Sequence, residues 1–388
     1  MYDFDTPVNR WNTNSLKWDI KEGELPMWVA DMDFKASPAI LHALEKRVEN
    51  GVYGYNIIPN EWSRAYVNWW DRRHHFKMEE EWLIFCTGVV PAISSCVRKL
   101  TTVAENVLVL TPVYNIFFNS IYNNGRNILE SRLTYENGVY EIDWKDFEEK
   151  LATPQTSLLI FCNPHNPVGK IWDKETLARV GELCKKNNVT VIADEIHCDL
   201  TEPGYEYVPF ASASGVCKDI SVTCIAPTKC FNIAGLQTAA VSVPNPQLRH
   251  KVWRALNTDE VAEPNTFAIQ AAVAAFEEGE PWLEELNEYT TANRRYVEAY
   301  VKKEIPTLSV VSGHATYLLW IDVSRISEDS KAFSEFLREK TGLFVSEGEE
   351  YGGDGKRFIR MNVACPRCYV EDGMKRLKEG VSLFLLEK

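Results

Sequence analysis

The sequence predicts an α/β protein with a mostly parallel sheet, together with a smaller α+β domain. Three observations support this fold class. Strand patterns alternate with helix patterns up to about residue 245, and several strands are continuous apolar runs, typical of strands buried on both faces. Long amphipathic helix patterns follow at 268–278 and 282–301, and strand patterns come after them at 315–323 and 357–363. With 388 residues and 45% hydrophobic content, the chain can bury a large core in two domains.

The alternation begins between residues 83 and 122. A strand or turn leads into a helix from about Ala92, and a strand at 106–110 ends in a turn at 111–114. Because helices separate these apolar runs, we expect the strands to lie in one sheet.

A second buried strand, at 157–162, runs into a loop that contains Pro164 and Pro167. Proline fixes its own backbone, so the side chain of Asn166 between them points in one direction at little further entropy cost. Asn166 is therefore a candidate ligand-binding residue. The alternative is an ordinary turn.

A third strand pattern, at 188–193, ends at Asp194. Open α/β sheets bind their ligands at the carboxyl ends of the strands, so Asp194 is a candidate site acid. The alternative is an aspartate that caps the following helix.

Lys229 stands alone at the tip of a small-residue turn, after an apolar run that starts at Cys224. A lysine in such a place is partly desolvated, which lowers its pKa and makes its amine available as a nucleophile for a Schiff base. The alternative is a surface lysine that follows a strand.

Four segments occur in a characteristic order along nearly the whole chain. They are Asn-Pro-His-Asn-Pro-Val-Gly at 163–169, Asp-Glu-Ile-His at 194–197, Phe-Asn-Ile-Ala-Gly-Leu at 231–236 after the lysine, and Phe-Ile-Arg-Met-Asn-Val-Ala at 358–364. This set resembles the fold-type I pyridoxal-phosphate enzymes, the aspartate aminotransferase superfamily. The resemblance implies an aspartate-aminotransferase-like fold, with pyridoxal 5'-phosphate as the cofactor.

Three amino-terminal segments carry a closer resemblance. They are Asn-Thr-Asn-Ser-Leu-Lys-Trp-Asp at 12–19, Pro-Met-Trp-Val-Ala-Asp-Met-Asp-Phe at 26–34, and Gly-Tyr at 54–55. They are similar to the MalY/PatB type of carbon–sulfur lyase, also called cystathionine β-lyase. The resemblance implies β-elimination on sulfur amino acids such as cystathionine or cysteine, giving a thiol, pyruvate and ammonia. It also implies a homodimer, in which Tyr55 reaches the neighbouring subunit's site.

The resemblance assigns roles to the candidate residues. Lys229 is the catalytic lysine, which carries the cofactor and removes the Cα proton, while Asp194 holds the pyridine nitrogen protonated. Asn166 binds a cofactor oxygen and Tyr114 stacks on the ring. Arg360 binds the substrate α-carboxylate as a planar bidentate pair. Tyr114 as an ordinary core residue and Arg360 in a structural salt bridge are the alternatives.

The segment Cys-Thr-Gly-Val-Val-Pro-Ala at 86–92 resembles the phosphate cup of the family. Gly88 allows close approach, and the N–H groups of Val89 and Val90 face the phosphate at a helix start. The alternative, a plain helix start, needs no ligand.

Two positions depart from the family pattern. His197 stands where many aminotransferases have a tyrosine that bonds the cofactor's phenolic oxygen, so that contact is absent, indirect or made by imidazole. Gln237 stands where an arginine often binds the phosphate, so the cup carries less positive charge. Thr228 is expected to supply a hydroxyl instead.

Lysine and aspartate alone do not decide between β-elimination and transamination, so an aminotransferase stays an alternative. The preference for elimination comes from the resemblance and from Trp11, Trp18 and Trp28, which either line an apolar entrance suited to a thioether or belong to the core. One MalY-type protein also restrains a transcription activator, so a lyase with a second, regulatory binding role is a further alternative.

Composition excludes other classes of function. The formal net charge of -13 opposes binding to nucleic-acid phosphates, and no apolar stretch approaches transmembrane length. The start, from Met1 to Asp5, lacks the basic and apolar regions of a signal peptide, so we expect a cytoplasmic location.

Many of the ten cysteines fall in apolar contexts, and we expect them to be reduced. Cys365 and Cys368 have the spacing of a zinc or redox pair. Because no second pair accompanies them, we predict no metal site.

Three regions follow from this organisation. We expect residues 1–45 to be an N-terminal segment of the small domain, residues 46–275 to be the large pyridoxal-phosphate-binding domain, and residues 276–388 to be the C-terminal small domain. No linker locates these boundaries better than about ten residues.

Overall fold

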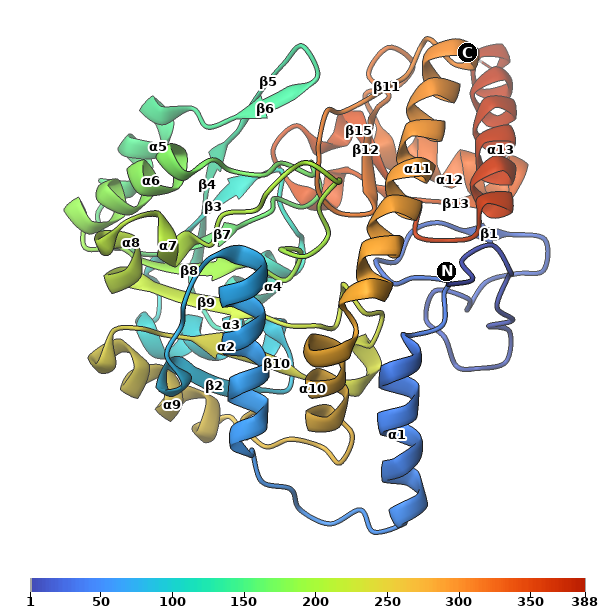
Figure 1. Cartoon of the computed structure of the whole chain (residues 1–388). Coiled ribbons are helices and arrows are strands. Elements are labelled where there is room, and N and C mark those ends of the chain that lie inside the picture. The colour runs from blue at the N-terminus through green and yellow to red at the C-terminus, as the bar shows by residue number, and fades with distance from the viewer. Residues whose placement is uncertain (1, 388) are drawn as a thin grey trace.

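Figure 1 shows the computed structural model of the chain, in which residues 2–387 are described. A large sheet with helices on both faces makes up one part, and a smaller sheet with its own helices makes up the other. Among residues 2–387, no helix is both long enough and apolar enough to span a membrane.

The large sheet contains seven strands in the order β2, β10, β9, β8, β7, β3, β4. They are β2 (Leu83–Cys86), β3 (Asn106–Thr111), β4 (Asn127–Arg132), β7 (Thr156–Cys162), β8 (Thr190–Asp194), β9 (Ser221–Ile225) and β10 (Ala239–Ser242). All neighbours from β4 to β9 pair in parallel, whereas β10 pairs antiparallel with β9 and β2. The prediction of a mostly parallel sheet is confirmed.

The register of the central strands brings together segments that are far apart in the sequence. Cys162 of β7 pairs with Asp194 of β8, which in turn pairs with Cys224 of β9. The carboxyl ends of these parallel strands therefore meet at one edge of the sheet, where open α/β sheets bind ligands. The loop that carries Asn166 and the turn that carries Lys229 follow this edge directly.

Helices cover both faces of the large sheet because successive strand residues point to opposite sides. In β7, Leu158 and Ile160 pack on one face, and Leu159 and Phe161 pack on the other. The first face is covered by α3 (Val89–Leu100), α4 (Ile116–Tyr122) and α9 (Pro246–Thr258). The second is covered by α5 (Trp144–Leu151), α6 (Lys174–Lys186), α7 (Phe210–Ala213) and α8 (Gly215–Ile220).

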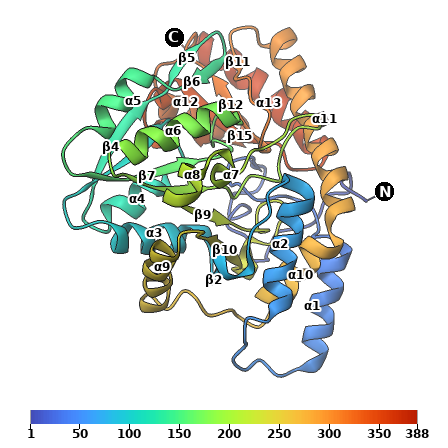
Figure 2. The ribbon, with the colours of Figure 1, turned by 60° about the vertical axis from the view of Figure 1, so that its left-hand side comes forward.

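Three further helices pack at the β2–β10 end of the large sheet (Figure 2). They are α1 (Pro38–Asn50), α2 (Asn60–His74) and α10 (Ala268–Glu278). Their shared core is aromatic, with Trp62, Trp69 and Phe276 fully buried. From this cluster α11 (Glu280–Glu304) leads into the smaller part of the molecule.

The smaller part is built on an antiparallel sheet in the order β11, β12, β15, β14. Its elements are β11 (Ser309–Val310), β12 (Leu318–Asp322), β14 (Ser346–Glu347), β15 (Phe358–Asn362), α12 (Ser330–Thr341) and α13 (Arg367–Leu386). The remaining short elements are β5 (Thr134–Glu136), β6 (Val139–Glu141), η1 (Glu80–Trp82), η2 (Ala234–Leu236), η3 (Glu349–Tyr351) and η4 (Gly355–Arg357), where η marks a 3₁₀ helix. The helices and strands predicted beyond residue 268 are thus present.

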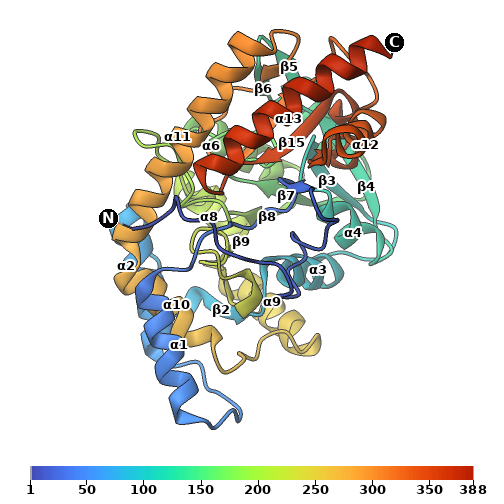
Figure 3. The same cartoon turned by 90° about the vertical axis from the view of Figure 1, so that its right-hand side faces the viewer.

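The chain before α1 crosses the molecule along the boundary between the two parts, as Figure 3 shows in dark blue. Within it, β1 (Leu25–Pro26) pairs in parallel with β13 (Leu343–Phe344). This pairing supports our proposal that the N-terminal segment and the C-terminal part form the small domain. The predicted boundaries at 45 and 275 fall inside α1 and α10, so we propose that the divisions lie at the ends of these helices.

Candidate active site

Lys229 follows β9 at the edge of the large sheet and is partly buried. Its Nζ donates a hydrogen bond of 2.6 Å to the carbonyl oxygen of Ala30. Burial and the positive charge of Arg360 lower the pKa of Lys229 to about 8, while Asp31 and Asp194 act in the opposite direction. An amine with this pKa is unprotonated in an appreciable fraction of molecules near neutral pH.

Asp194 is the last residue of β8, and its side chain is buried. Burial raises the pKa of Asp194 to about 7, although the Ile196 N–H and the charge of Lys229 oppose this change. Its Oδ1 accepts a hydrogen bond of 3.1 Å from that N–H. A buried carboxylate with so little compensation favours a cationic partner, and a protonated ring nitrogen would fit this requirement.

Arg360 comes from β15 of the small sheet, and its side chain is buried. Its Nη1 donates to Asn166 Oδ1 at 3.3 Å, and its Nη2 donates to the carbonyl oxygen of Trp28 at 3.1 Å. Its Nε has no hydrogen-bond partner among residues 2–387. The guanidinium, which lies 5.0 Å from the ring centre of Tyr351, thus keeps a donor for a carboxylate.

His197 is buried, and its Nδ1 has no hydrogen-bond partner in the described part of the chain. Burial lowers the pKa of His197 to about 3, and the charges of Lys229 and Arg360 act in the same direction. The imidazole is therefore neutral, with one donor and one acceptor nitrogen. An unpaired ring nitrogen fits the oxygen of a ligand. Thr228, directly before the lysine, is also buried.

The predicted phosphate cup lies at the start of α3. This helix begins at Val89, earlier than the expected Ala92, because Pro91 is tolerated in a first turn where its missing N–H would have no partner. Gly88 precedes the helix in an extended conformation, and a Cβ there would meet the Pro91 ring at 3.2 Å. The N–H groups of Val89 and Val90 belong to the first helical turn, which favours an anion.

Tyr114 lies in the turn after β3 and is partly buried. Burial raises the pKa of Tyr114, and the charges of Arg360 and Asp194 also reach its hydroxyl, which places the residue beside the cluster. Two other candidates lie elsewhere. Tyr55 is fully exposed between α1 and α2, and Gln237 is exposed after η2.

The structure adds residues to the site that the motifs did not identify. The buried Tyr317 donates a hydrogen bond of 3.1 Å to the Ala30 carbonyl, the same oxygen that Lys229 contacts. Asn362 donates two hydrogen bonds of 2.6 Å to carbonyl groups of the N-terminal segment. Asn362 belongs to the arginine motif, but Tyr317 lies in the strand predicted at 315–323, and nothing in that strand pattern indicates a polar role.

The three tryptophans proposed for an apolar entrance occupy different places. Trp18 is buried, and the partly exposed Trp11 packs against it edge to face at 5.6 Å. Trp28 stacks on Phe344 at 4.7 Å, and its backbone carbonyl contacts the guanidinium of Arg360. Trp18 is therefore a core residue, and Trp28 stays a candidate for the entrance.

The partly buried His74 and the buried Cys198 and Asp199 place three potential metal ligands within 4.8 Å of one another. Asp199 is already paired with His74 Nε2 at 2.9 Å and with Arg73 Nε at 3.0 Å. A positive guanidinium at this carboxylate disfavours a metal cation. We interpret the group as a structural ion pair.

Comparison with known proteins places this geometry in a family. The sequence model described as aminotransferase class I and II matches residues 24–377. Cystathionine beta-lyase PatB from Bacillus subtilis (strain 168) is 40% identical over 387 residues, covering 98% of this chain and 100% of the relative. Protein MalY from Escherichia coli (strain K12) is 30% identical, covering 98% of this chain and 99% of MalY.

A solved structure is also similar to this chain over nearly its whole length. The crystal structure of cystalysin from Treponema denticola, which contains a pyridoxal 5'-phosphate cofactor, matches with a TM-score of 0.95 and 32% identity. The match covers 98% of this chain and 99% of cystalysin. The chain therefore belongs to the aminotransferase class I and II family and, within it, to the group that includes PatB and MalY.

Proposed function

We propose that the protein is a pyridoxal-phosphate-dependent carbon–sulfur lyase that eliminates a thiol from sulfur amino acids such as cystathionine or cysteine. The products are the thiol, pyruvate and ammonia. The observation that carries the choice of β-elimination is the 40% identity to cystathionine beta-lyase PatB over 98% of this chain. The meeting of Lys229, Asp194 and Arg360 near one sheet edge supports the cofactor and an amino-acid substrate. The names of PatB and of the pyridoxal-phosphate-containing cystalysin support the same reaction and cofactor.

The residues around the sheet edge fit this cofactor. Pyridoxal phosphate, when bound, supplies an aldehyde that reacts with amines and a ring that stabilises negative charge at the substrate Cα. We propose Lys229 for the covalent attachment and Asp194 for the ring nitrogen. The other contacts that we propose are Tyr114 on the ring face, Asn166 and His197 at ring oxygens, and Thr228, Gly88, Val89 and Val90 at the phosphate.

Arg360 would hold the substrate by its α-carboxylate. A planar guanidinium binds a carboxylate through two parallel hydrogen bonds, which fixes orientation as well as position. Asn166 Oδ1, at 3.3 Å from Nη1, holds the guanidinium in place. A substrate held in this way would have its Cα–H bond within reach of Lys229 as the proposed base.

Lys229 Nζ would remove the proton from the substrate Cα. A general base works best when its pKa lies near the working pH, and the pKa of about 8 meets this condition. The Ala30 carbonyl, at 2.6 Å, gives the amine a fixed hydrogen-bond acceptor.

The products distinguish this proposal from an aminotransferase. Cystathionine without any added keto acid is expected to give homocysteine, pyruvate and ammonia over many turnovers, because elimination leaves no amino group on the enzyme. An aminotransferase would stop after one turnover and resume when a keto acid is added. The time course of pyruvate release therefore decides between the two reactions.

We further propose a homodimer in which Tyr55 completes the partner's site. Tyr55 and its neighbours Val52, Tyr53 and Ile57 are exposed apolar residues on one segment, a pattern typical of an interface. Mixing inactive Tyr55→Ala and Lys229→Ala proteins is expected to restore part of the activity, since a hybrid dimer contains one intact site. A monomer in sedimentation, or no recovery after verified subunit exchange, would contradict this proposal.

A further inference from the structure

The segment from Trp28 to Phe34, here called the 28–34 segment, lies against the candidate site through its backbone. The carbonyl oxygen of Trp28 accepts from Arg360 Nη2 at 3.1 Å. The carbonyl oxygen of Ala30 accepts from Lys229 Nζ at 2.6 Å and from the Tyr317 hydroxyl at 3.1 Å. The two residues that we propose as substrate handle and base therefore share one stretch of main chain.

This stretch also connects the two domains. Asn232, from the large domain, donates through Nδ2 to the carbonyl groups of Met32 and Phe34 at 3.0 and 2.8 Å. Asn362, from the small domain, donates to Val29 and Asp31. The 28–34 segment contains no helix or strand of its own, so side chains set its path.

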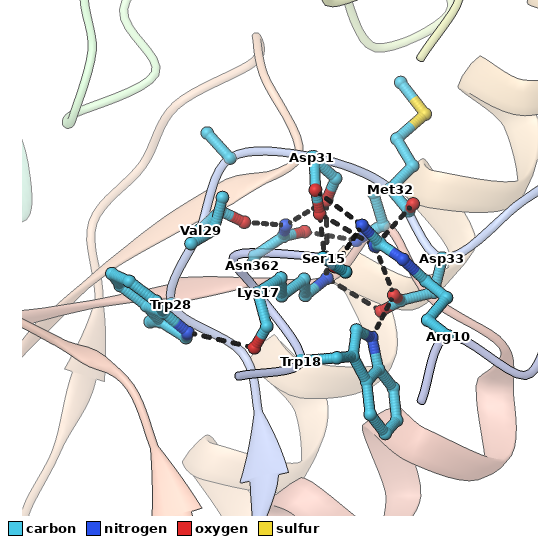
Figure 4. Close-up of polar contacts among 12 residues, drawn as sticks. Arg10, Ser15, Lys17, Trp18, Trp28, Val29, Asp31, Met32, Asp33 and Asn362 are labelled. Carbon is cyan, nitrogen blue, oxygen red and sulfur yellow. Dashed lines mark hydrogen bonds and ion pairs between the residues drawn. The ribbon is translucent and has the colours of Figure 1, made fainter. Parts of the chain in front are cut away.

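A compact group of charges holds the carboxyl end of the segment (Figure 4). Asp33 accepts from Lys17 Nζ at 2.7 Å, Arg10 Nη1 at 2.8 Å and Trp18 Nε1 at 2.8 Å. Arg10 also forms a bidentate pair with Asp31, at 3.0 and 2.8 Å. Lys17 and Asp33 are almost fully buried.

These charges connect directly to the segment's main chain. Lys17 Nζ donates to the Asp31 carbonyl at 3.3 Å, and Arg10 Nη1 donates to the Met32 carbonyl at 3.1 Å. Buried ion pairs contribute little net stability compared with apolar residues of the same size, but they impose geometry because each partner must stay paired. A group of this kind suits a segment that must keep one path.

We propose that Lys17, Asp33 and Arg10 are positioning residues for the reaction. Their ion pairs hold the 28–34 segment so that the Ala30 carbonyl meets Lys229 Nζ and the Trp28 carbonyl meets the Arg360 guanidinium. The proposal rests on the proposed function for the steps that these two residues perform. The position of Lys229 Nζ, in contrast, depends only on the protein chain and can be tested without the reaction.

The test begins with Asp33→Asn, which removes the charge and keeps the size of the side chain. In the full-length protein freed of cofactor, Lys229 is methylated with formaldehyde and cyanoborohydride over a range of pH, and its peptide is quantified. If the 28–34 segment moves in this variant, the Ala30 carbonyl and the Asp31 carboxylate move away from Lys229 Nζ. The ammonium form is then less favoured, so the pH midpoint of Lys229 methylation should shift to lower pH. In the holoenzyme, kcat/KM should fall about 10²-fold.

Glu24→Gln is the matched control. It breaks a bidentate pair to Arg338, at 2.8 and 2.9 Å, in the same N-terminal segment but away from the 28–34 carbonyls. This variant should keep both the pH midpoint of Lys229 methylation and the activity. If Asp33→Asn does not fold, the double variant Lys17→Met/Asp33→Asn is used in its place. This double variant removes one charge of each sign, so no unpaired charge is left buried.

A folded Asp33→Asn or double variant with an unchanged methylation midpoint and unchanged kcat/KM overturns the proposal. The same change in Glu24→Gln would also overturn it, because the effect would then be general to the segment. Since methylation needs neither cofactor nor turnover, it reports the positioning even if cystathionine is not a substrate.

Discussion

Two buried aspartates, Asp194 at the edge of the large sheet and Asp33 in the N-terminal segment, differ in their electrostatics. Burial acts to raise the pKa of both carboxyl groups. For Asp194 burial prevails, and the pKa is about 7. For Asp33, the cations and the indole N–H that surround it outweigh burial, and the pKa lies below its ordinary value of 3.8.

The difference distinguishes a ligand-binding residue from a structural one. A buried charge without compensation is typical of a group that awaits a ligand, whereas a fully paired charge fixes the shape of the chain. We therefore expect Asp194 to matter for rate and Asp33 to matter for stability and placement.

The largest effect is expected for Asp194→Ala. Without the carboxylate, the ring nitrogen of the cofactor loses its acidic partner, and kcat should fall by about 10²–10⁴-fold, the range of a positioned acid–base group. Stopped assays of pyruvate formation measure the loss. Activity within about tenfold of the wild type would show that Asp194 does not serve the reaction.

Asp33→Asn should lower the stability of the fold in addition to its effect on kcat/KM. It leaves the ammonium of Lys17 buried and poorly paired, which typically costs about 3–5 kcal/mol of unfolding free energy. The partly buried pair broken by Glu24→Gln leaves Arg338 open to solvent, so its loss should cost less, about 1 kcal/mol. Urea unfolding at pH 7 compares the two variants, and equal losses would remove the contrast between Asp33 and an ordinary ion pair.

The pH dependence of the Asp33 contribution has a definite sign. Since the folded pKa is lowered, the stabilisation is present above the ordinary value of 3.8 and is lost as the pH falls through the folded pKa. The difference between wild type and Asp33→Asn should therefore shrink in acid.

Arg360→Lys should have an intermediate effect on activity. The lysine keeps the positive charge but loses the planar fork, so the substrate is held less well and kcat/KM should fall by about 10²-fold. Both kcat and KM should change, because orientation and affinity are lost together. A change confined to KM would mean that the guanidinium only attracts the substrate.

The smallest expected effect is a gain in stability for Asp194→Asn in the cofactor-free protein. Because the folded pKa of about 7 lies above 3.8, the folded state retains the proton longer, and wild-type stability should fall as the pH rises between these values. At pH 8 the variant should be more stable than the wild type by on the order of 1 kcal/mol or more, because its amide buries no charge. Thermal unfolding at pH 5 and pH 8 measures this difference. A variant less stable than wild type at both values would contradict the uncompensated charge.

The candidate site residues at the edge of the large sheet could be predicted because their side chains directly follow strands that are recognisable in the sequence. Asn166, Asp194 and Lys229 each follow a continuous apolar run, and the parallel pairing of those runs brings them together. Strand positions were also predictable, since buried strands leave a plain pattern in the sequence.

The role of the 28–34 segment could not be predicted in the same way. Its contacts to Lys229 and Arg360 are made by the carbonyl oxygens of Ala30 and Trp28, which every residue type provides. The motif at 26–34 marked the region as characteristic of the family, but only the fold shows which side chains meet its main chain. Tyr317 escaped notice for a related reason, because a tyrosine in an apolar strand is usually core.

Chemical mapping of the cofactor lysine tests the central assignment most directly. The holoenzyme is reduced with borohydride, digested and searched for the pyridoxyl group by mass spectrometry. We predict the label on the peptide that contains Lys229, and we predict that Lys229→Ala is folded, unlabelled at that peptide and inactive. A pyridoxyl group on another lysine, or normal turnover by Lys229→Ala, would contradict the account.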